Sequence, residues 1–351
     1  MTYLDYAATN PWPKYKCSDY GWHFNPNTNY AFGEKKLLQV CEKHVKKAIG
    51  AHGGKVIFGG TASQLVENLM NCDRADFWPV GSAYEHDSID RFLIEHNLHN
   101  IEELEETLKT FTPTGMNPFV FWQGVNNVTG RIFDVETIGR LCHKYGAFFV
   151  CDMTAMIGHA PIPCKIDEWC DCAFWSGHKI STELGIGAMW ISDEFNRRLG
   201  DFKLHGTPNV AGALAITDAT EDAVKSAPYN ELHYYELTKT LKNGLEANGI
   251  EYDIMSDKQS VAVRAHAINA IRLKGINADA LQQYLASKQI YVSIGASACA
   301  EAHDYRVLNA FGLTDKEASE VIRVSFGEDS TIDNVNKLVE WIKEFKKRFI
   351  R

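Results

Sequence analysis

The chain has 351 residues, of which 45% are hydrophobic and 23% are charged. This is ordinary globular composition, and the length suits one large domain with a smaller one. The net charge of -9 and the dispersed Lys and Arg residues argue against a surface for nucleic acids or anionic membranes. No apolar run reaches the roughly 18 residues that a membrane span requires.

The nine cysteines are scattered, and no spacing among them is typical of a zinc site. The first residues lack the basic and apolar segments of a signal peptide. We therefore expect a cytoplasmic protein with free thiols and no bound metal.

Short apolar runs alternate with helical patterns from about residue 55 to residue 190. We expect strands at 56–58, 119–122, 147–151 and 187–191, and helices at 63–70 and 135–145. This alternation predicts an α/β fold, with a mostly parallel sheet covered by helices on both faces.

The second half of the chain begins with two helical patterns and then changes character. We expect helices at 210–225, 230–248, 278–287 and 334–347, and strands at 267–273 and 322–325. The pattern changes to a compact α+β segment after Gly249. It predicts a large domain at 11–249 and a small domain formed by 1–10 and 250–351.

Two residues stand where buried strands are expected to end. Lys179 closes a run in which apolar residues give way to Ser176-Gly177-His178. A desolvated lysine amine there can form a Schiff base, although an isolated lysine of this kind is more often a surface residue. Asp152 follows another strand and would face the crevice of a parallel sheet, although such a residue is more often a helix cap.

Two further segments carry groups suited to a ligand. Gly59-Gly60-Thr61-Ala62-Ser63 lies between a strand and a helix, where backbone N–H groups and the Ser63 hydroxyl can cradle a phosphate. His86 precedes a helical pattern, and its imidazole can stack on a ring or relay protons. A surface or capping histidine is an equal alternative.

The second domain contributes a thiol and a guanidinium. Cys299 is flanked by small residues, which predicts an accessible loop and a possible nucleophile. Arg323 is a charge inside an apolar strand, so its partner is a carboxylate, either structural or from a substrate.

Together these residues resemble the NifS/IscS-like cysteine desulfurases, which are class V, fold type I enzymes dependent on pyridoxal 5'-phosphate (PLP). The likeness runs almost from end to end. It rests on Tyr3-Leu4-Asp5-Tyr6-Ala7-Ala8-Thr9, Glu85-His86, Val125-Asn126-Asn127, Asp152, Ser176-Gly177-His178-Lys179, Gly206-Thr207, Ser297-Ala298-Cys299 and Ile322-Arg323-Val324-Ser325-Phe326-Gly327.

The resemblance implies a role for each matching residue. Lys179 would hold PLP as a Schiff base and act as the base at the substrate Cα, and Asp152 would pair with the pyridinium nitrogen. His86 would stack on the ring and help protonation. Asn127 would contact the ring and the substrate, and Arg323 would bind the substrate carboxylate. Thr207 would contact the phosphate of the cofactor in the neighbouring subunit. The residues that would bind the phosphate within the chain are Ala62, Ser63, Ser176 and His178.

The implied reaction converts L-cysteine to L-alanine and leaves the sulfur as a persulfide on Cys299. The resemblance also implies a homodimer and a sulfur-acceptor protein, such as an iron–sulfur scaffold or a tRNA-thiolation enzyme.

The chain departs from the family pattern at Ala155, where a Gln is usual, and at Thr182, Glu183 and Leu204. Two alternatives therefore stay open. One is another class V reaction, by a C–S or selenocysteine lyase or an aminotransferase. The other is a catalytically quiet PLP-binding partner in sulfur trafficking.

Overall fold

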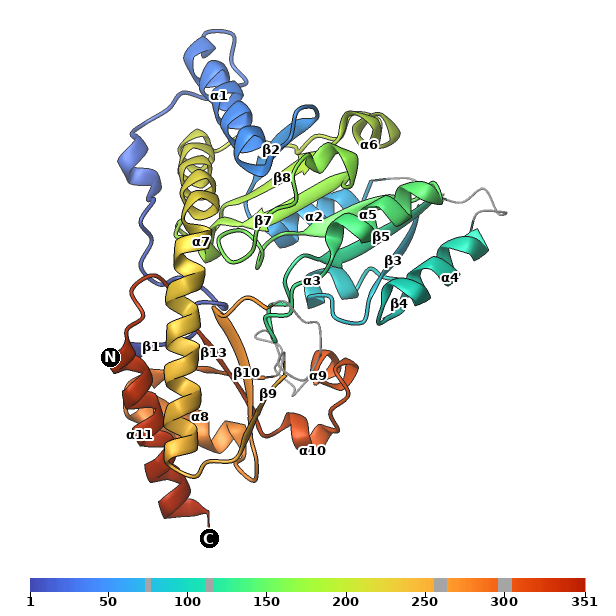
Figure 1. Ribbon diagram of the computed structural model, residues 1–351. Helices are drawn as coiled ribbons and strands as arrows, with labels where there is room; N and C mark the ends of the chain where they lie inside the picture. Colours follow the sequence, from blue (N-terminus) through green and yellow to red (C-terminus); the bar gives the residue numbers. More distant parts are fainter. Residues whose placement is uncertain (73–76, 112–116, 256–263, 296–304, 351) are drawn as a thin grey trace. The chain divides into compact units, whose positions relative to one another are not determined.

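The computed structural model describes residues 1–72, 77–111, 117–255, 264–295 and 305–350. The chain forms two compact units (Figure 1). The large unit comprises Pro11–Gly124 and Phe133–Ala227, and the small unit comprises Met1–Asn10, Val125–Ile132 and Pro228–Arg351. The boundary that the pattern predicts near residue 249 lies beyond the change of unit at Pro228.

The large unit is built on a seven-stranded sheet in the order β2-β8-β7-β6-β5-β3-β4. β8 runs antiparallel to β2 and β7, and every other neighbouring pair is parallel. This confirms the predicted mostly parallel α/β sheet. The strands are β2 (Lys55–Gly59), β3 (Phe77–Ser82), β4 (Glu95–Leu98), β5 (Asn117–Gln123), β6 (Phe148–Asp152), β7 (Cys172–Ser176) and β8 (Gly187–Ile191).

Helices cover both faces of this sheet, as the alternating pattern predicts. Successive residues of a strand point to opposite faces. Val150 of β6 belongs to a buried cluster with Leu65 of α2, whereas its neighbour Phe149 lies against Gly139 of α5. The helices of this unit are α1 (Phe32–Ile49), α2 (Ala62–Met70), α3 (Asp87–Asp90), α4 (Ile101–Phe111), α5 (Val135–Lys144) and α6 (Asp193–Arg198), with short 3-10 turns η1 (Cys17–Tyr20), η3 (Ile166–Glu168) and η4 (Gly177–Lys179).

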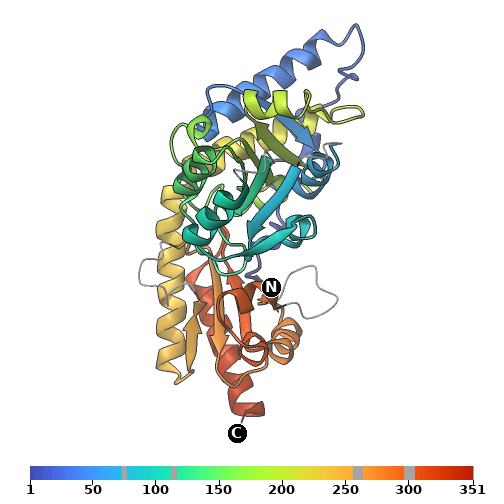
Figure 2. The same ribbon diagram turned by 90° about the vertical axis from the view of Figure 1, so that its right-hand side faces the viewer.

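The small unit contains an antiparallel four-stranded sheet in the order β12-β13-β10-β9 and a parallel pair β1-β11. The C-terminal helix α11 leads to the end of the chain in both views (Figures 1 and 2). The strands are β1 (Thr2–Tyr3), β9 (Tyr252–Ile254), β10 (Ile268–Leu273), β11 (Ile290–Tyr291), β12 (Ser293–Ile294) and β13 (Val321–Ser325), and the helices are α8 (Ala278–Ser287), α9 (Arg306–Ala310), α10 (Asp315–Ala318) and α11 (Ile332–Phe349).

One predicted break is absent. The pattern predicts two helices between residues 210 and 248, but α7 is a single helix, Val210–Ala247, with Pro228 inside it. Proline removes one backbone donor and disfavours a helix interior. Fully buried apolar residues on both sides of it, such as Ile216 and Leu237, hold the helix by tertiary packing. Within the described ranges, no helix is both long and apolar enough to cross a membrane.

Candidate active site

The predicted site residues of the large unit gather at one edge of its sheet. Because β8 is antiparallel to both neighbours, β2 and β7 end beside the start of β8, and Gly187 lies opposite both Gly59 and Ser176. The parallel strands β6, β5 and β3 end at the same edge. The last residues of these strands and the segments that follow them carry a set that we call the strand-end cluster: Ala62, Ser63, His86, Asp152, Ser176, His178 and Lys179.

Lys179 lies in the η4 turn, directly after the fully buried strand β7. This confirms that it follows a buried strand end, and its side chain is half-buried. The Ile180 N–H closes the turn by donating to the Gly177 carbonyl at 2.9 Å, and the Gly177 N–H donates to the Ile186 carbonyl beside the start of β8, also at 2.9 Å. A Cβ atom at Gly177 would come within 2.3 Å of Thr182 Oγ1, so only glycine fits. The fold therefore gives Lys179 a defined place at the sheet edge.

His178 is the neighbour of this lysine and has an altered acidity. Burial, and then the charge of Lys179, lower the pKa of His178 to about 4. The imidazole is consequently neutral near pH 7 and offers one N–H donor. An anion placed beside it would favour its protonated form.

Asp152 ends β6 as a carboxylate that is only 8% exposed. Its Oδ1 accepts a hydrogen bond from the Thr154 N–H at 2.8 Å, and its carbonyl accepts one from Gly124 at 2.9 Å. The described residues 153–160 form turns and not a helix, so Asp152 caps no helix. Ala155, at the position of the family's Gln, is also buried and brings no side-chain donor.

The glycine-rich turn after β2 leads into helix α2, which begins one residue before the predicted start at residue 63. Thr61 is the N-cap of α2, and its Oγ1 accepts from the Gln64 N–H at 3.0 Å. Ala62 and Ser63 occupy the first helical turn, where N–H groups have no acceptor within the helix and can bind an anion. A Cβ at Gly187 would come within 2.7 Å of the Ala62 nitrogen, so β8 passes closely against this turn.

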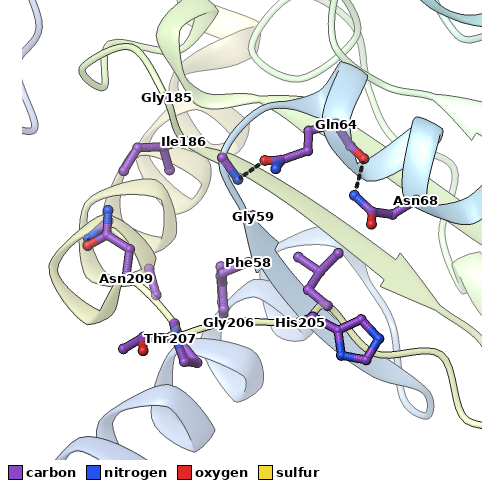
Figure 3. A pocket seen from close by; sticks show the side chains of 15 residues that line it. Phe58, Gly59, Gln64, Asn68, Gly185, Ile186, His205, Gly206, Thr207 and Asn209 are labelled. Carbon is purple, nitrogen blue, oxygen red and sulfur yellow. Dashed lines mark hydrogen bonds between the residues drawn. The ribbon is translucent and has the colours of Figure 1, made fainter. Parts of the chain in front are cut away.

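A pocket of about 330 Å³ opens beside the same turn. Gly59, Gly60 and Gln64 line one part of it, and the segment that contains Thr207 lines another (Figure 3). Gln64 Oε1 accepts from the Gly60 N–H at 3.1 Å. The described lining does not include Lys179, so the pocket lies next to the strand-end cluster rather than within it. The structure thus puts Thr207 near the glycine-rich turn of its own chain, and its predicted role in a neighbouring subunit stays a prediction.

His86 is the N-cap of the short helix α3. Its Nδ1 accepts from the Ser88 N–H at 3.1 Å and lies 2.9 Å from the Ser88 hydroxyl oxygen. The structure therefore confirms a capping role for Nδ1 of His86. A neutral imidazole that accepts at Nδ1 carries its proton on Nε2. The ring face is not engaged by these bonds and can still stack on a cofactor.

Arg323 lies in β13 of the small unit and is only 2% exposed. Its two terminal nitrogens donate to Asp5 Oδ1 at 3.0 Å, to Ser293 Oγ at 3.1 Å and to the Asn127 carbonyl at 3.1 Å. The predicted carboxylate partner exists and is Asp5 of the same chain. The structure also brings Asn127 and Arg323 together, and Arg323 Nε has no hydrogen-bond partner in the described part of the chain.

The predicted nucleophile, Cys299, lies outside the described residues. Several other thiols belong to the core, and burial raises their pKa, which makes them poor nucleophiles. These buried cysteines are Cys41, Cys142, Cys151, Cys170 and Cys172.

Sequence reasoning missed three residues that support the site. Asp5 pairs with Arg323, and Glu85 and Gln123 bond to each other beneath the turn that carries His86. The only available signal was the place of Glu85 between an apolar strand and His86. The donors and acceptors of the strand-end cluster fit PLP: an amine, a carboxylate for the ring nitrogen, an imidazole, and a helix start for the phosphate.

Comparisons with known proteins agree with this arrangement. The family model for aminotransferase class-V matches residues 93–338. The cysteine desulfurase IscS of Clostridium botulinum is 27% identical, with 99% of this chain and 95% of that protein aligned. The putative cysteine desulfurase NifS of Bacillus subtilis is 25% identical, with 97% and 93% aligned.

Solved structures share the fold over nearly the whole length. A NifS-like protein from Rickettsia africae superposes with a TM-score of 0.83 at 22% identity, covering 99% of both chains. The apo cysteine desulfurase of Thermococcus onnurineus gives a TM-score of 0.76 at 20% identity, covering 99% of this chain and 94% of the other. The chain belongs to the aminotransferase class-V family and has the α/β fold of the fold type I PLP enzymes.

Proposed function

We propose that the protein is a PLP-dependent cysteine desulfurase that converts L-cysteine to L-alanine and passes the sulfur to Cys299. The observation that carries the proposal is the strand-end cluster. One sheet edge presents Lys179, the buried Asp152 carboxylate, His86 and the start of α2 at or after the ends of β7, β6, β3 and β2. The full-length similarity to named cysteine desulfurases supports this choice among class V reactions.

Bound PLP supplies an electron sink for the negative charge that develops at the substrate Cα. Asp152 would pair with the ring nitrogen and keep it protonated. The N–H groups of Ala62 and Ser63, with Ser176 and His178, would hold the phosphate. Lys179 would hold the cofactor covalently and, once its amine is released, remove the Cα proton.

The bonds of His86 restrict what it does with protons. Its Nδ1 accepts from the Ser88 N–H, so the neutral ring already carries a proton on Nε2. Nε2 can take up a proton only after the ring changes tautomer, which places a proton on Nδ1 and removes the bond from Ser88. We therefore assign the Cα proton to Lys179, and assign to His86 the stacking role and an N–H donor role.

The substrate carboxylate is assigned to Arg323 and Asn127 of the small unit. The Asp5 carboxylate already offsets part of the Arg323 charge, and Nε–H remains for a further acceptor. The Cys299 thiolate would then attack the substrate sulfur. An S–S bond forms, the C–S bond breaks, and its electron pair leaves with the carbon that becomes the alanine methyl group.

Two departures from the family pattern have a structural role in this chain. Glu183 accepts from the Cys17 N–H at 2.8 Å, and Thr182 forms a parallel bridge with Tyr15. These residues anchor the segment before η1, so their change does not by itself indicate lost activity. The proposed setting is a cytoplasmic homodimer, in which Thr207 reaches the partner's phosphate, with a sulfur-acceptor protein such as an iron–sulfur scaffold or a tRNA-thiolation enzyme.

The test follows alanine and sulfide from L-cysteine, and persulfide on the protein, with PLP bound. We expect alanine from the wild type, its loss in Cys299→Ala, and no change in the matched control Cys164→Ala, whose thiol is exposed. Full-rate sulfide release by Cys299→Ala would establish the lyase alternative. PLP binding without any product would establish the quiet partner.

A further inference from the structure

Beneath the strand-end cluster lies a carboxylate that has no part in the chemistry proposed above. Glu85 is 0% exposed and follows β3 in the turn that leads to α3. Its Oε1 accepts a hydrogen bond from the Ser82 hydroxyl and another from the Gln123 N–H, the latter at 3.2 Å. Burial of a carboxylate is unfavourable unless hydrogen bonds compensate it, and these two donors compensate Oε1.

The side chain of Gln123 makes a second hydrogen bond to the same turn. It is 2% exposed, and its Nε2 donates to the Tyr84 carbonyl. Gln123 donates both hydrogen bonds, one from its backbone and one from its side chain, and together they tie residues 84 and 85 to the end of β5. We call Glu85 and Gln123 the turn clasp.

The turn clasp lies beside Asp152, the carboxylate of the strand-end cluster. Gln123 pairs with Asp152 in the register of β5 and β6, and Gly124 donates to the Asp152 carbonyl at 2.9 Å. Burial is the main cause of the raised pKa of the Cys151 thiol, and the negative charges of Asp152 and Glu85 raise it further. The end of β5 thus connects the turn before α3 to the end of β6.

His86 directly follows the clasped residue. Its ring is oriented by Ser88, as described above, but those bonds lie within the turn itself and do not fix the turn to the sheet. The turn clasp joins this turn to the neighbouring strand β5 through Gln123. A displaced turn would carry the imidazole with it, whereas Asp152 would stay on β6.

We propose that Glu85 is a positioning residue: with Gln123 it fixes the turn that carries His86 relative to Asp152, and thereby sets how the imidazole meets the cofactor ring. The inference rests on the proposed function, because it needs PLP in the strand-end cluster. Glu85 itself touches neither cofactor nor substrate in this account, and acts through His86.

The experiment is a double-mutant cycle on the PLP-loaded protein, with Glu85→Ala, His86→Ala and the double variant. The readouts are the visible circular dichroism of the bound cofactor, which reports ring orientation, and the rate of PLP release. We expect Glu85→Ala to speed release on the order of two- to tenfold, the range typical of lost ring contacts. In the His86→Ala background the same change should have no further effect.

Two variants sharpen the result. Glu85→Gln should restore most of the signal, since an amide oxygen can accept both hydrogen bonds. Glu106→Ala, at an exposed side chain of the same unit, should match the wild type. If Glu85→Ala fails to fold, Gln123→Ala removes the side-chain bond to the Tyr84 carbonyl, keeps the backbone bond to Glu85, and enters the same cycle.

The proposal is overturned if Glu85→Ala speeds PLP release as much in the His86→Ala background as in the wild type. It is also overturned if Glu85→Ala has the wild-type rate of PLP release and the wild-type circular dichroism. Failure of the proposed function looks different. In that case the wild type itself shows no visible band after addition of PLP.

Discussion

Replacement of Asp5 by alanine tests the ion pair that positions Arg323. The guanidinium of Arg323 is 2% exposed, and its carboxylate partner lies 3.0 Å away with 18% exposure. Ser293 Oγ lies 2.8 Å from both carboxylate oxygens and completes the network. In Asp5→Ala the buried cation retains only neutral acceptors, which are the Asn127 carbonyl and the Ser293 hydroxyl.

The magnitude follows from this burial. Removal of one partner from a buried ion pair costs about 3–5 kcal/mol, because the other charge is left uncompensated. Asp5 keeps some contact with water, so we expect the lower end, about 3 kcal/mol. The double variant Asp5→Ala/Arg323→Met should recover most of this loss, since it removes the orphaned charge as well.

The assay is hydrogen exchange of the β13 amides, together with urea unfolding, because a chain with two units need not unfold in one step. The matched control is Lys337→Ala, which breaks an exposed pair with Asp333 at 52% and 69% exposure. That change should cost no more than about 0.5 kcal/mol. The role assigned to this ion pair is contradicted if Asp5→Ala lowers the free energy of unfolding as little as the control does. It is also contradicted if the double variant is less stable than Asp5→Ala.

Three further predictions concern the large unit. The hydrogen bond to Asp171 raises the pKa of His143, so this stabilisation is complete below about pH 6.5 and is lost as pH rises through the folded pKa. His143→Gln should remove that decline from urea titrations, and an unchanged decline would contradict the pairing. His178, with its pKa lowered to about 4, makes the cofactor-free protein lose stability as pH falls from about 6.5 towards 4. His178→Gln should reduce this loss of stability at low pH. An unchanged dependence of the free energy of unfolding on pH would assign the loss to other groups. Asp152→Asn removes a charged hydrogen bond worth roughly 1.5–3 kcal/mol, so alanine formation should slow about 10- to 100-fold with PLP still bound. A wild-type rate would exclude the carboxylate from the chemistry.

The strand-end cluster was predictable because its signals are local. Lys179 and Asp152 each follow a continuous apolar run, and such runs end at the same edge when the strands are parallel. The structure places both where the pattern indicates.

The supporting contacts were not predictable, because they join residues far apart in the sequence. Asp5 and Arg323 are 318 positions apart, and Glu85 and Gln123 are 38 apart. No periodicity encodes such pairs. The helix predicted from residue 63 begins at Ala62 with Thr61 as its N-cap, a small shift that the backbone geometry decides. The continuity of α7 through Pro228 is a case in which tertiary packing overrides local propensity.

The most direct test of the account is the identity of the lysine that holds the cofactor. The protein, loaded with PLP, is reduced with borohydride, digested and analysed by mass spectrometry, with Lys179→Ala as the parallel sample. The account predicts a phosphopyridoxyl group on Lys179 and on no other lysine, and its absence from the variant. Modification of a different lysine, or an unmodified Lys179 in a protein with bound PLP, would contradict it.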